Sequence, residues 1–263
     1  MKLNLEKYSK VVLIAIALVL VCCTVSLIVL AINGFSIDSF DRGKNTNTDR
    51  TALTSRLTET PDYGETYINN VIFIGDSTIS AMRQAAVLRD GTDTKQIWSG
   101  ESNTLSLDYG LSSATIVYPE TGESILISEA ISLKLPEYVI ITLGADNGVA
   151  YCTEEKFKNY YSGLIVSIKE SSPNTKIILQ SVFPVSEKKQ KDDSGLTNKK
   201  IDRANGWIEE LAQSLSVKYL DTASILKDSK GNLLSIYDSG DGVTLNAEGY
   251  TAVLNYIRTH GYR

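Results

Sequence analysis

The sequence is poor in histidine and cysteine. His260 is its single histidine among 263 residues, and two of its three cysteines, Cys22 and Cys23, lie in one apolar run. Cys152 is therefore alone in the rest of the chain, which excludes an internal disulfide there and favours an inert, partly buried thiol. A zinc site with two or more histidine or cysteine ligands is excluded as well. We expect no metal and no other cofactor.

Basic residues are fewer than acidic ones. The chain has 26 Lys and Arg against 31 Asp and Glu, a net charge of −5 and a sequence pI near 5.1. No basic stripe stands out, so nucleic acid is not expected as a partner. A composition of 43 % hydrophobic and 22 % charged residues is that of an ordinary globular protein. It leaves room for one sizeable domain and accessory segments.

One apolar run is long enough to cross a membrane. Residues 11–32 carry no charge, and as a helix they would span roughly 33 Å, against a hydrocarbon core of about 30 Å. The alternative, a cleaved signal peptide, has a shorter apolar region that ends in a small-x-small site. This run ends in Ala31-Ile32-Asn33-Gly34, which is a poor cleavage site. A lipoprotein signal is also disfavoured, because Val21 precedes Cys22.

The charges beside this run indicate its orientation. Lys2, Lys7 and Lys10 precede it, whereas the residues after it carry both signs. Basic residues stay on the cytoplasmic side, so we expect residues 1–10 in the cytoplasm and the rest of the chain outside the plasma membrane. Residues 33–67 are rich in Asn, Asp, Thr and Ser and are expected to form a flexible linker. The folded domain is expected over residues 68–263.

Within that domain, short apolar runs alternate with amphipathic stretches. The sequence predicts strands at residues 71–74, 96–98, 138–143, 176–182 and 218–220. It predicts helices at residues 78–88, 123–133, 154–170, 199–215 and 247–259. Strands this apolar are covered on both faces, and intervening helices imply parallel pairing. We therefore expect a doubly wound α/β sheet with its site at the carboxyl ends of the strands.

Four polar motifs follow these predicted strands or open a predicted helix. Gly75-Asp76-Ser77-Thr78 follows the first strand, and Gly100 follows the second. Gly144-Ala145-Asp146-Asn147 follows the third, and Asp241-Gly242-Val243-Thr244 precedes the last helix. Ser77 is thus placed where backbone N–H groups can stabilise a developing oxyanion. Taken alone, the first motif is also compatible with a simple helix cap.

In this order, the motifs resemble the sequence blocks of the SGNH/GDSL hydrolases. The resemblance covers residues 70–260 and implies a three-layer, flavodoxin-like SGNH-hydrolase fold. Bacterial surface-anchored members are the most similar in their last block, which reads Asp-Gly-x-His-Leu-Asn. The resemblance implies that Ser77 is the nucleophile, that the Ser77 and Gly100 N–H groups bind the oxyanion, and that Asp241 orients a histidine.

Two positions depart from the family pattern. Asp146 stands where the family has an asparagine that donates to the oxyanion, and Asn147 follows one residue later. An ionised Asp only accepts hydrogen bonds, so either Asn147 turns inward or this donor is missing. Thr244 stands at the position of the catalytic histidine. A threonine hydroxyl cannot act as a general base near neutral pH.

His260 is not expected to replace the missing base. It follows the start of the last predicted helix by about 13 residues, which is roughly 20 Å along the axis. The resemblance implies an ester hydrolase of a bacterial surface, acting on O-acyl groups of envelope or environmental glycans. The departures indicate impaired catalysis. The alternative is a pseudoenzyme that binds a glycan or an envelope protein through the same cleft.

Overall fold

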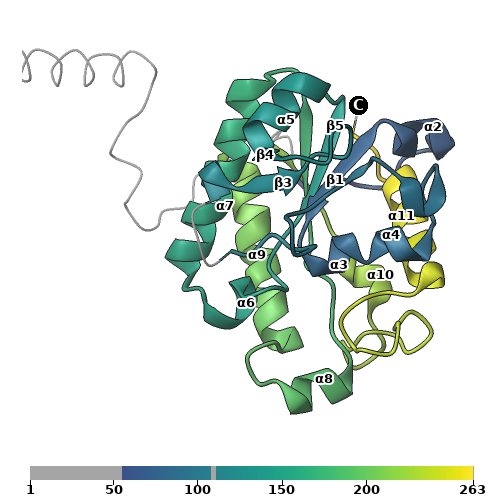
Figure 1. Cartoon of the computed structure of the whole chain (residues 1–263). Helices are drawn as coiled ribbons and strands as arrows, with labels where there is room; N and C mark the ends of the chain where they lie inside the picture. The colour runs from purple at the N-terminus through teal and green to yellow at the C-terminus, as the bar shows by residue number, and fades with distance from the viewer. Residues whose placement is uncertain (1–54, 108–110, 263) are drawn as a thin grey trace, which may run out of the picture. The chain divides into compact units, whose positions relative to one another are not determined.

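The main sheet has five parallel strands. The structure, a computed structural model, describes residues 55–107 and 111–262. The strands are β1 (Val71–Gly75), β2 (Ile97–Trp98), β5 (Tyr138–Thr142), β6 (Lys176–Gln180) and β7 (Lys218–Leu220). They run in the order β2-β1-β5-β6-β7, with β5 in the centre. Counted within this sheet, that is the flavodoxin-like order 2-1-3-4-5. The neighbouring strands β1 and β5 are labelled in Figure 1. The predicted α/β fold with a central parallel sheet is confirmed.

Both faces of the sheet are buried. In β1, Val71 and Phe73 belong to one apolar core cluster, while Ile72 and Ile74 belong to the other. Every residue of β5 is also buried. Alternate residues of a strand point to opposite faces, so an unbroken apolar run lets one strand contribute to two cores.

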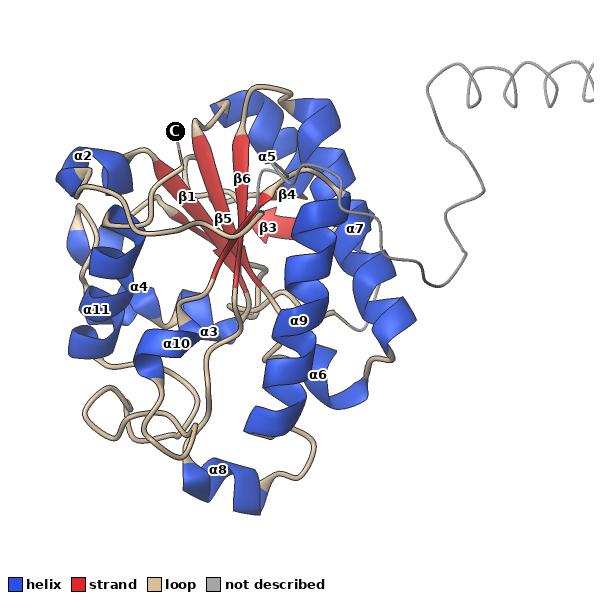
Figure 2. Ribbon diagram, turned by 180° about the vertical axis from the view of Figure 1, so that it is seen from behind, coloured by secondary structure: helices blue, strands red, loops and turns tan. Residues whose placement is uncertain are grey.

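Helices form a layer on each face (Figure 2). One layer consists of α5 (Ile127–Lys134), α7 (Glu154–Ser171) and α9 (Asn198–Ser214). The other consists of α2 (Gly64–Asn69), α4 (Met82–Ala85), α10 (Ala223–Leu226) and α11 (Ala247–Arg258). Short helices in the connections are α3 (Ser77–Ser80), η2 (Gly91–Asp93), η3 (Leu111–Ser113), α6 (Gly148–Tyr151) and α8 (Glu187–Asp192). The three longest helices, α7, α9 and α11, begin and end within one residue of the predicted bounds.

Two predicted helices are different in the structure. The helix expected at 78–88 is divided into α3 and α4, and Ala86, with φ 53°, ends the second. The helix expected at 123–133 begins only at Ile127, because β4 (Ser124–Leu126) pairs with β3 (Thr115–Val117) in an antiparallel hairpin. These strands are too short for their alternation to stand out from a helical pattern.

The segment before residue 68 packs against the main sheet. Arg56 lies beside β7, where the Leu57 N–H donates to the Tyr219 carbonyl at 2.8 Å. The Arg56 guanidinium binds Glu209 at 2.6 and 2.7 Å and Asp221 at 2.9 Å. The described part of the expected linker, from Ser55 to Tyr67, therefore contacts the domain.

The predicted membrane segment lies outside the described residues. No helix within residues 55–107 and 111–262 combines the length and apolarity needed to span a bilayer. Residues 1–10, the apolar run at 11–32 and most of the predicted linker belong to the part of the chain that the structure does not describe.

Candidate active site

A cleft of about 540 Å³ lies beyond the carboxyl ends of β1 and β5. Five of the six residues singled out from the sequence as site residues line it: Ser77, Asp146, Asn147, Asp241 and Thr244. Gly100 is not among the described residues that line it. The parallel sheet thus brings together loops that are far apart in the sequence.

Ser77 is held in place by its two predecessors. Gly75 ends β1, and a Cβ at this position would lie 2.4 Å from the Ile79 side chain and 2.8 Å from the Thr142 carbonyl oxygen. The Asp76 side chain caps α3 by accepting hydrogen bonds from the N–H and hydroxyl of Thr78 at 3.1 and 2.6 Å. Ser77 is therefore the first residue of α3, directly above the end of the strand.

Asp76 also fixes the loop that carries Asp146. Its second oxygen accepts hydrogen bonds from the N–H groups of Gly144 and Ala145, both at 2.9 Å. The residue is 1 % exposed. Burial, and then the charge of Asp146, raise the pKa of Asp76 to about 6, although hydrogen bonds from Thr78 and Ala145 oppose this shift. The buried Asp76 carboxylate thus joins the start of α3 to the loop that follows β5.

Asp146 contacts Ser77 directly. One carboxylate oxygen accepts the Ser77 hydroxyl at 2.8 Å, and the other accepts the Ser77 backbone N–H at 2.9 Å. The Thr104 hydroxyl donates to the same carboxylate. The resemblance implies an asparagine at position 146 that donates a hydrogen bond to the oxyanion. This chain has the Asp146 carboxylate there, which is an acceptor and already accepts the Ser77 N–H.

The other expected donors are directed elsewhere. Asn147 has φ 63°, and its amide nitrogen donates to the Ser106 hydroxyl at 3.1 Å. The Gly100 N–H donates to the Thr104 carbonyl at 3.1 Å, and a Cβ on Gly100 would lie 2.5 Å from that oxygen. Of the two alternatives left open by the sequence, the structure thus places Asp146, and not Asn147, at Ser77.

Asp241 and Thr244 form a closed hydrogen-bonded turn. One Asp241 oxygen accepts the N–H groups of Val243 and Thr244 at 2.7 Å, and the other accepts the Thr244 hydroxyl at 2.8 Å. The Ser239 hydroxyl lies 2.6 Å from that of Thr244. Desolvation raises the pKa of Asp241, but these hydrogen bonds outweigh it and lower the pKa below its usual value. This turn supplies no group able to take a proton from a serine near neutral pH.

His260 is engaged in a separate set of contacts. Its ring stacks on that of Tyr256 with 3.8 Å between centroids, and its Nδ1 lies 3.0 Å from the Tyr256 carbonyl oxygen. It follows the end of α11 and is not among the described residues that line the cleft. These contacts agree with a structural role for this histidine.

The cleft also contains residues that the sequence did not single out. They are Thr104, Ser106, Ala145, Ala150, Tyr151, Lys189, Asp193, Leu196 and Val243. Tyr151 is 78 % exposed, and the Lys189 ammonium lies 3.7 Å from the Asp193 carboxylate. Hydroxyl groups two residues apart at Thr104 and Ser106, close behind Gly100, were the available signal for part of this set.

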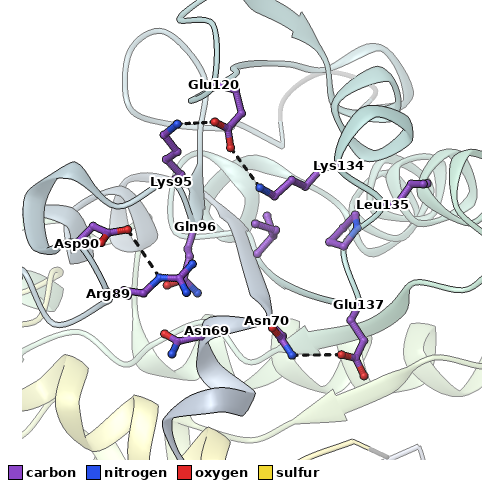
Figure 3. A pocket seen from close by; sticks show the side chains of 12 residues that line it. Asn69, Asn70, Arg89, Asp90, Lys95, Gln96, Glu120, Lys134, Leu135 and Glu137 are labelled. Atoms are coloured by element: carbon purple, nitrogen blue, oxygen red, sulfur yellow. Dashed lines mark hydrogen bonds and ion pairs between the residues drawn. The ribbon is translucent and has the colours of Figure 1, made fainter.

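A second hollow, of about 490 Å³, lies at the opposite end of β1 and β5 (Figure 3). Its charged side chains have partners: Glu120 forms ion pairs with both Lys95 and Lys134, and Glu137 accepts a hydrogen bond from the neutral Asn70 amide at 3.3 Å. No serine, threonine, cysteine or histidine is among the described residues that line it. The described lining of this second hollow therefore offers no hydroxyl, thiol or imidazole group as a nucleophile.

Comparisons with known proteins give a family match and similar solved structures. Residues 73–252 match the model of the GDSL-like lipase/acylhydrolase family. No curated protein matches the sequence significantly. A Streptococcus pneumoniae structure, provisionally described as a platelet activating factor, is 22 % identical with a TM-score of 0.54, covering 72 % of this chain and 82 % of its own. A Clostridium thermocellum family 3 carbohydrate esterase is 16 % identical with a TM-score of 0.48, covering 72 % and 93 %.

Proposed function

The chain belongs to the GDSL-like lipase/acylhydrolase family, the SGNH/GDSL hydrolases, and from this premise we propose that it is a membrane-anchored, extracytoplasmic O-acyl-esterase-like protein with impaired catalysis. Its cleft binds acylated glycans of the envelope or the environment and hydrolyses their esters very slowly. One observation carries this proposal. The Ser77 hydroxyl and N–H both donate to the Asp146 carboxylate, while Thr244 occupies the position of the base.

Ester hydrolysis by a serine needs a group that removes the hydroxyl proton and returns it to the leaving alcohol. Asp146 accepts a hydrogen bond from the Ser77 hydroxyl, but a carboxylate is a much weaker base than the imidazole that serves this role in a serine triad. Loss of the histidine from a serine-protease triad lowers kcat about 10⁶-fold. About 10³- to 10⁴-fold catalysis over water survives such losses through oxyanion donors and binding.

The oxyanion site is weakened as well. An ester oxyanion on Ser77 needs the N–H of this residue, which already donates to Asp146. It would also approach the negative charge of the carboxylate. The missing base and the occupied donor act against the same transition state, so we expect slow turnover.

The alternative function is binding without hydrolysis, of a glycan or an envelope protein. The exposed Tyr151 ring at the cleft favours it, because an aromatic face packs well against the apolar face of a sugar. Hydroxyl groups of Ser77, Thr104, Ser106 and Thr244 line the same space.

Hydrolysis of p-nitrophenyl acetate by the full-length protein in detergent distinguishes these functions from ordinary esterase activity. We expect the wild-type rate to be at or barely above that of Ser77→Ala. Rapid wild-type turnover that disappears in Ser77→Ala would overturn the proposal, because another group would then have to serve as the base.

A further inference from the structure

The Asp146 carboxylate contacts Ser77 in the cleft that both residues line. It receives three hydrogen bonds, from the Ser77 N–H, the Ser77 hydroxyl and the Thr104 hydroxyl. Two of them join one oxygen, so the other oxygen receives only the Ser77 hydroxyl. Because a carboxylate oxygen accepts about two hydrogen bonds, this second oxygen retains capacity for a donor from a ligand.

The position of this carboxylate is fixed by the backbone. Asp76 holds the N–H groups of Gly144 and Ala145, and the Gly148 N–H donates to the Asp146 carbonyl at 2.8 Å. The Val149 N–H closes the loop on the Gly144 carbonyl at 2.8 Å. A loop braced in this way presents the carboxylate to the cleft without further rearrangement.

Acidic side chains outnumber basic ones in the cleft. Its charged lining residues are Asp146, Asp193, Asp241 and Lys189, and the Lys189 ammonium lies 3.7 Å from the Asp193 carboxylate. Three acids against one lysine leave an excess of two negative charges. An acidic or oxyanion-bearing ligand is repelled here, whereas a cation is attracted.

We propose that Asp146 makes the Ser77 cleft selective for sugars that carry a free amino group. The ammonium group donates to the Asp146 oxygen that receives only the Ser77 hydroxyl, and the sugar ring packs on the exposed Tyr151. This inference rests on the proposed function, because it names the glycan class that the same cleft binds.

The direct test compares the binding of three sugar trimers to the full-length protein by calorimetry. The probes are trimers of glucosamine, N-acetylglucosamine and galacturonate, at about pH 6, where the sugar amines are protonated. One charge-assisted hydrogen bond corresponds to a preference of about tenfold for glucosamine over N-acetylglucosamine. Galacturonate is expected to bind most weakly. Equal affinity for the first two probes, or no binding of any probe, overturns the proposal without reference to any variant.

Two variants assign the preference to a residue. Asp146→Asn removes the charge with little change of shape, and the preference for glucosamine should fall below about threefold. Asp192→Asn makes the same change of net charge at an exposed residue of α8 that does not line the cleft, and the preference should remain. A preference that persists in Asp146→Asn, or disappears in Asp192→Asn, contradicts the assignment.

The outcome is distinguishable from failure of the proposed function. Ser77-dependent hydrolysis of p-nitrophenyl acetate would refute impaired catalysis whatever the sugar selectivity is. An inert cleft without amine preference would refute only the present inference.

Discussion

The hydroxyl of Tyr250 donates a hydrogen bond to the carbonyl of Thr78. Tyr250 belongs to α11, which begins just after Thr244, and Thr78 follows Ser77 in α3. Tyr250 is fully buried, and burial raises the pKa of its phenol, so the proton stays in place. This contact joins the two segments that carry the outer parts of the candidate active site.

Tyr250→Phe should therefore destabilise the domain. The substitution keeps the ring but leaves the buried Thr78 carbonyl without this donor, which costs about 1–3 kcal/mol. Urea unfolding measures the change. Tyr151→Phe is the matched control, since that residue is 78 % exposed and its loss of a hydroxyl should change stability by less than about 0.5 kcal/mol. Equal effects of the two substitutions would contradict the role of the buried contact.

Much of the fold can be predicted from the sequence because its signals are local and strong. The central strand β5 is an unbroken apolar run, and α7 carries its apolar residues at three- and four-residue spacing. The position of Ser77 also follows from local features, namely Gly75 at a strand end and Asp76 as a cap.

The arrangement inside the cleft could not be predicted in the same way. Which of Asp146 and Asn147 meets Ser77 depends on the positive φ of Asn147 and on Asp76, which follows the neighbouring strand β1 and holds the loop although it is far away in the sequence. The contact of Thr104 with Asp146 depends on a turn in which the Gly100 N–H donates to the Thr104 carbonyl. These are long-range or backbone-dependent contacts without a pattern in the chain.

The central position of β5 gives a second stability prediction. Ile140 is fully buried, so Ile140→Asp would place an unpaired charge between the sheet and its helices at a cost of several kcal/mol. Ile236→Asp is the control, because Ile236 is 65 % exposed and should tolerate the charge. The measurement is thermal unfolding. A melting temperature of Ile140→Asp within a degree or two of the wild type would be incompatible with the position of β5.

The pH dependence of stability should distinguish Asp76 from Asp241. Burial raises the pKa of Asp76 to about 6, above the value of about 3.9 expected in the unfolded chain. Between these values the folded state keeps a proton that the unfolded state has released. The contribution of this group is therefore complete below about pH 4 and is lost as the pH rises to about 6.

Urea unfolding of the wild type and Asp76→Asn across this range measures the effect. The wild-type stability relative to the variant should decrease from about pH 4 to about pH 6. For Asp241, whose pKa is lowered, the same comparison with Asp241→Asn should show a contribution that is present above about pH 4 and lost below it. A wild-type advantage over Asp76→Asn that increases between pH 4 and 6 would mean that hydrogen bonds to the ionised Asp76 outweigh its burial.

The proposed membrane topology predicts a protease pattern. With Lys2, Lys7 and Lys10 inside, protease added to intact cells without a wall should release the folded domain. Cleavage is expected in the linker, residues 33–67, and mainly before Ser55, because the chain packs on the sheet from there. A tag at the amino terminus should be protected. Digestion of that tag together with protection of a carboxyl-terminal tag would reverse the orientation.

The last prediction concerns the chemistry of the cleft. Thr244→His should supply a base beside Asp241, whose oxygens accept hydrogen bonds from the backbone N–H and hydroxyl at this position. Hydrolysis of p-nitrophenyl acetate should then rise above the wild-type rate, recovering part of a loss of about 10⁶-fold. Ser77→Ala in the Thr244→His background is the control and should abolish the gain.

Recovery should be incomplete while Asp146 holds the Ser77 N–H. Asp146→Asn combined with Thr244→His replaces the carboxylate by an amide that can donate to the oxyanion, and one such donor contributes about 10²- to 10³-fold to kcat. The double variant should therefore exceed Thr244→His alone, whereas Asp146→Asn alone should remain near the wild-type rate because no base is present. If Asp146→Asn reduced the rate of the Thr244→His variant, Asp146 would have to assist the reaction, and its contact with Ser77 would be catalytic and not obstructive.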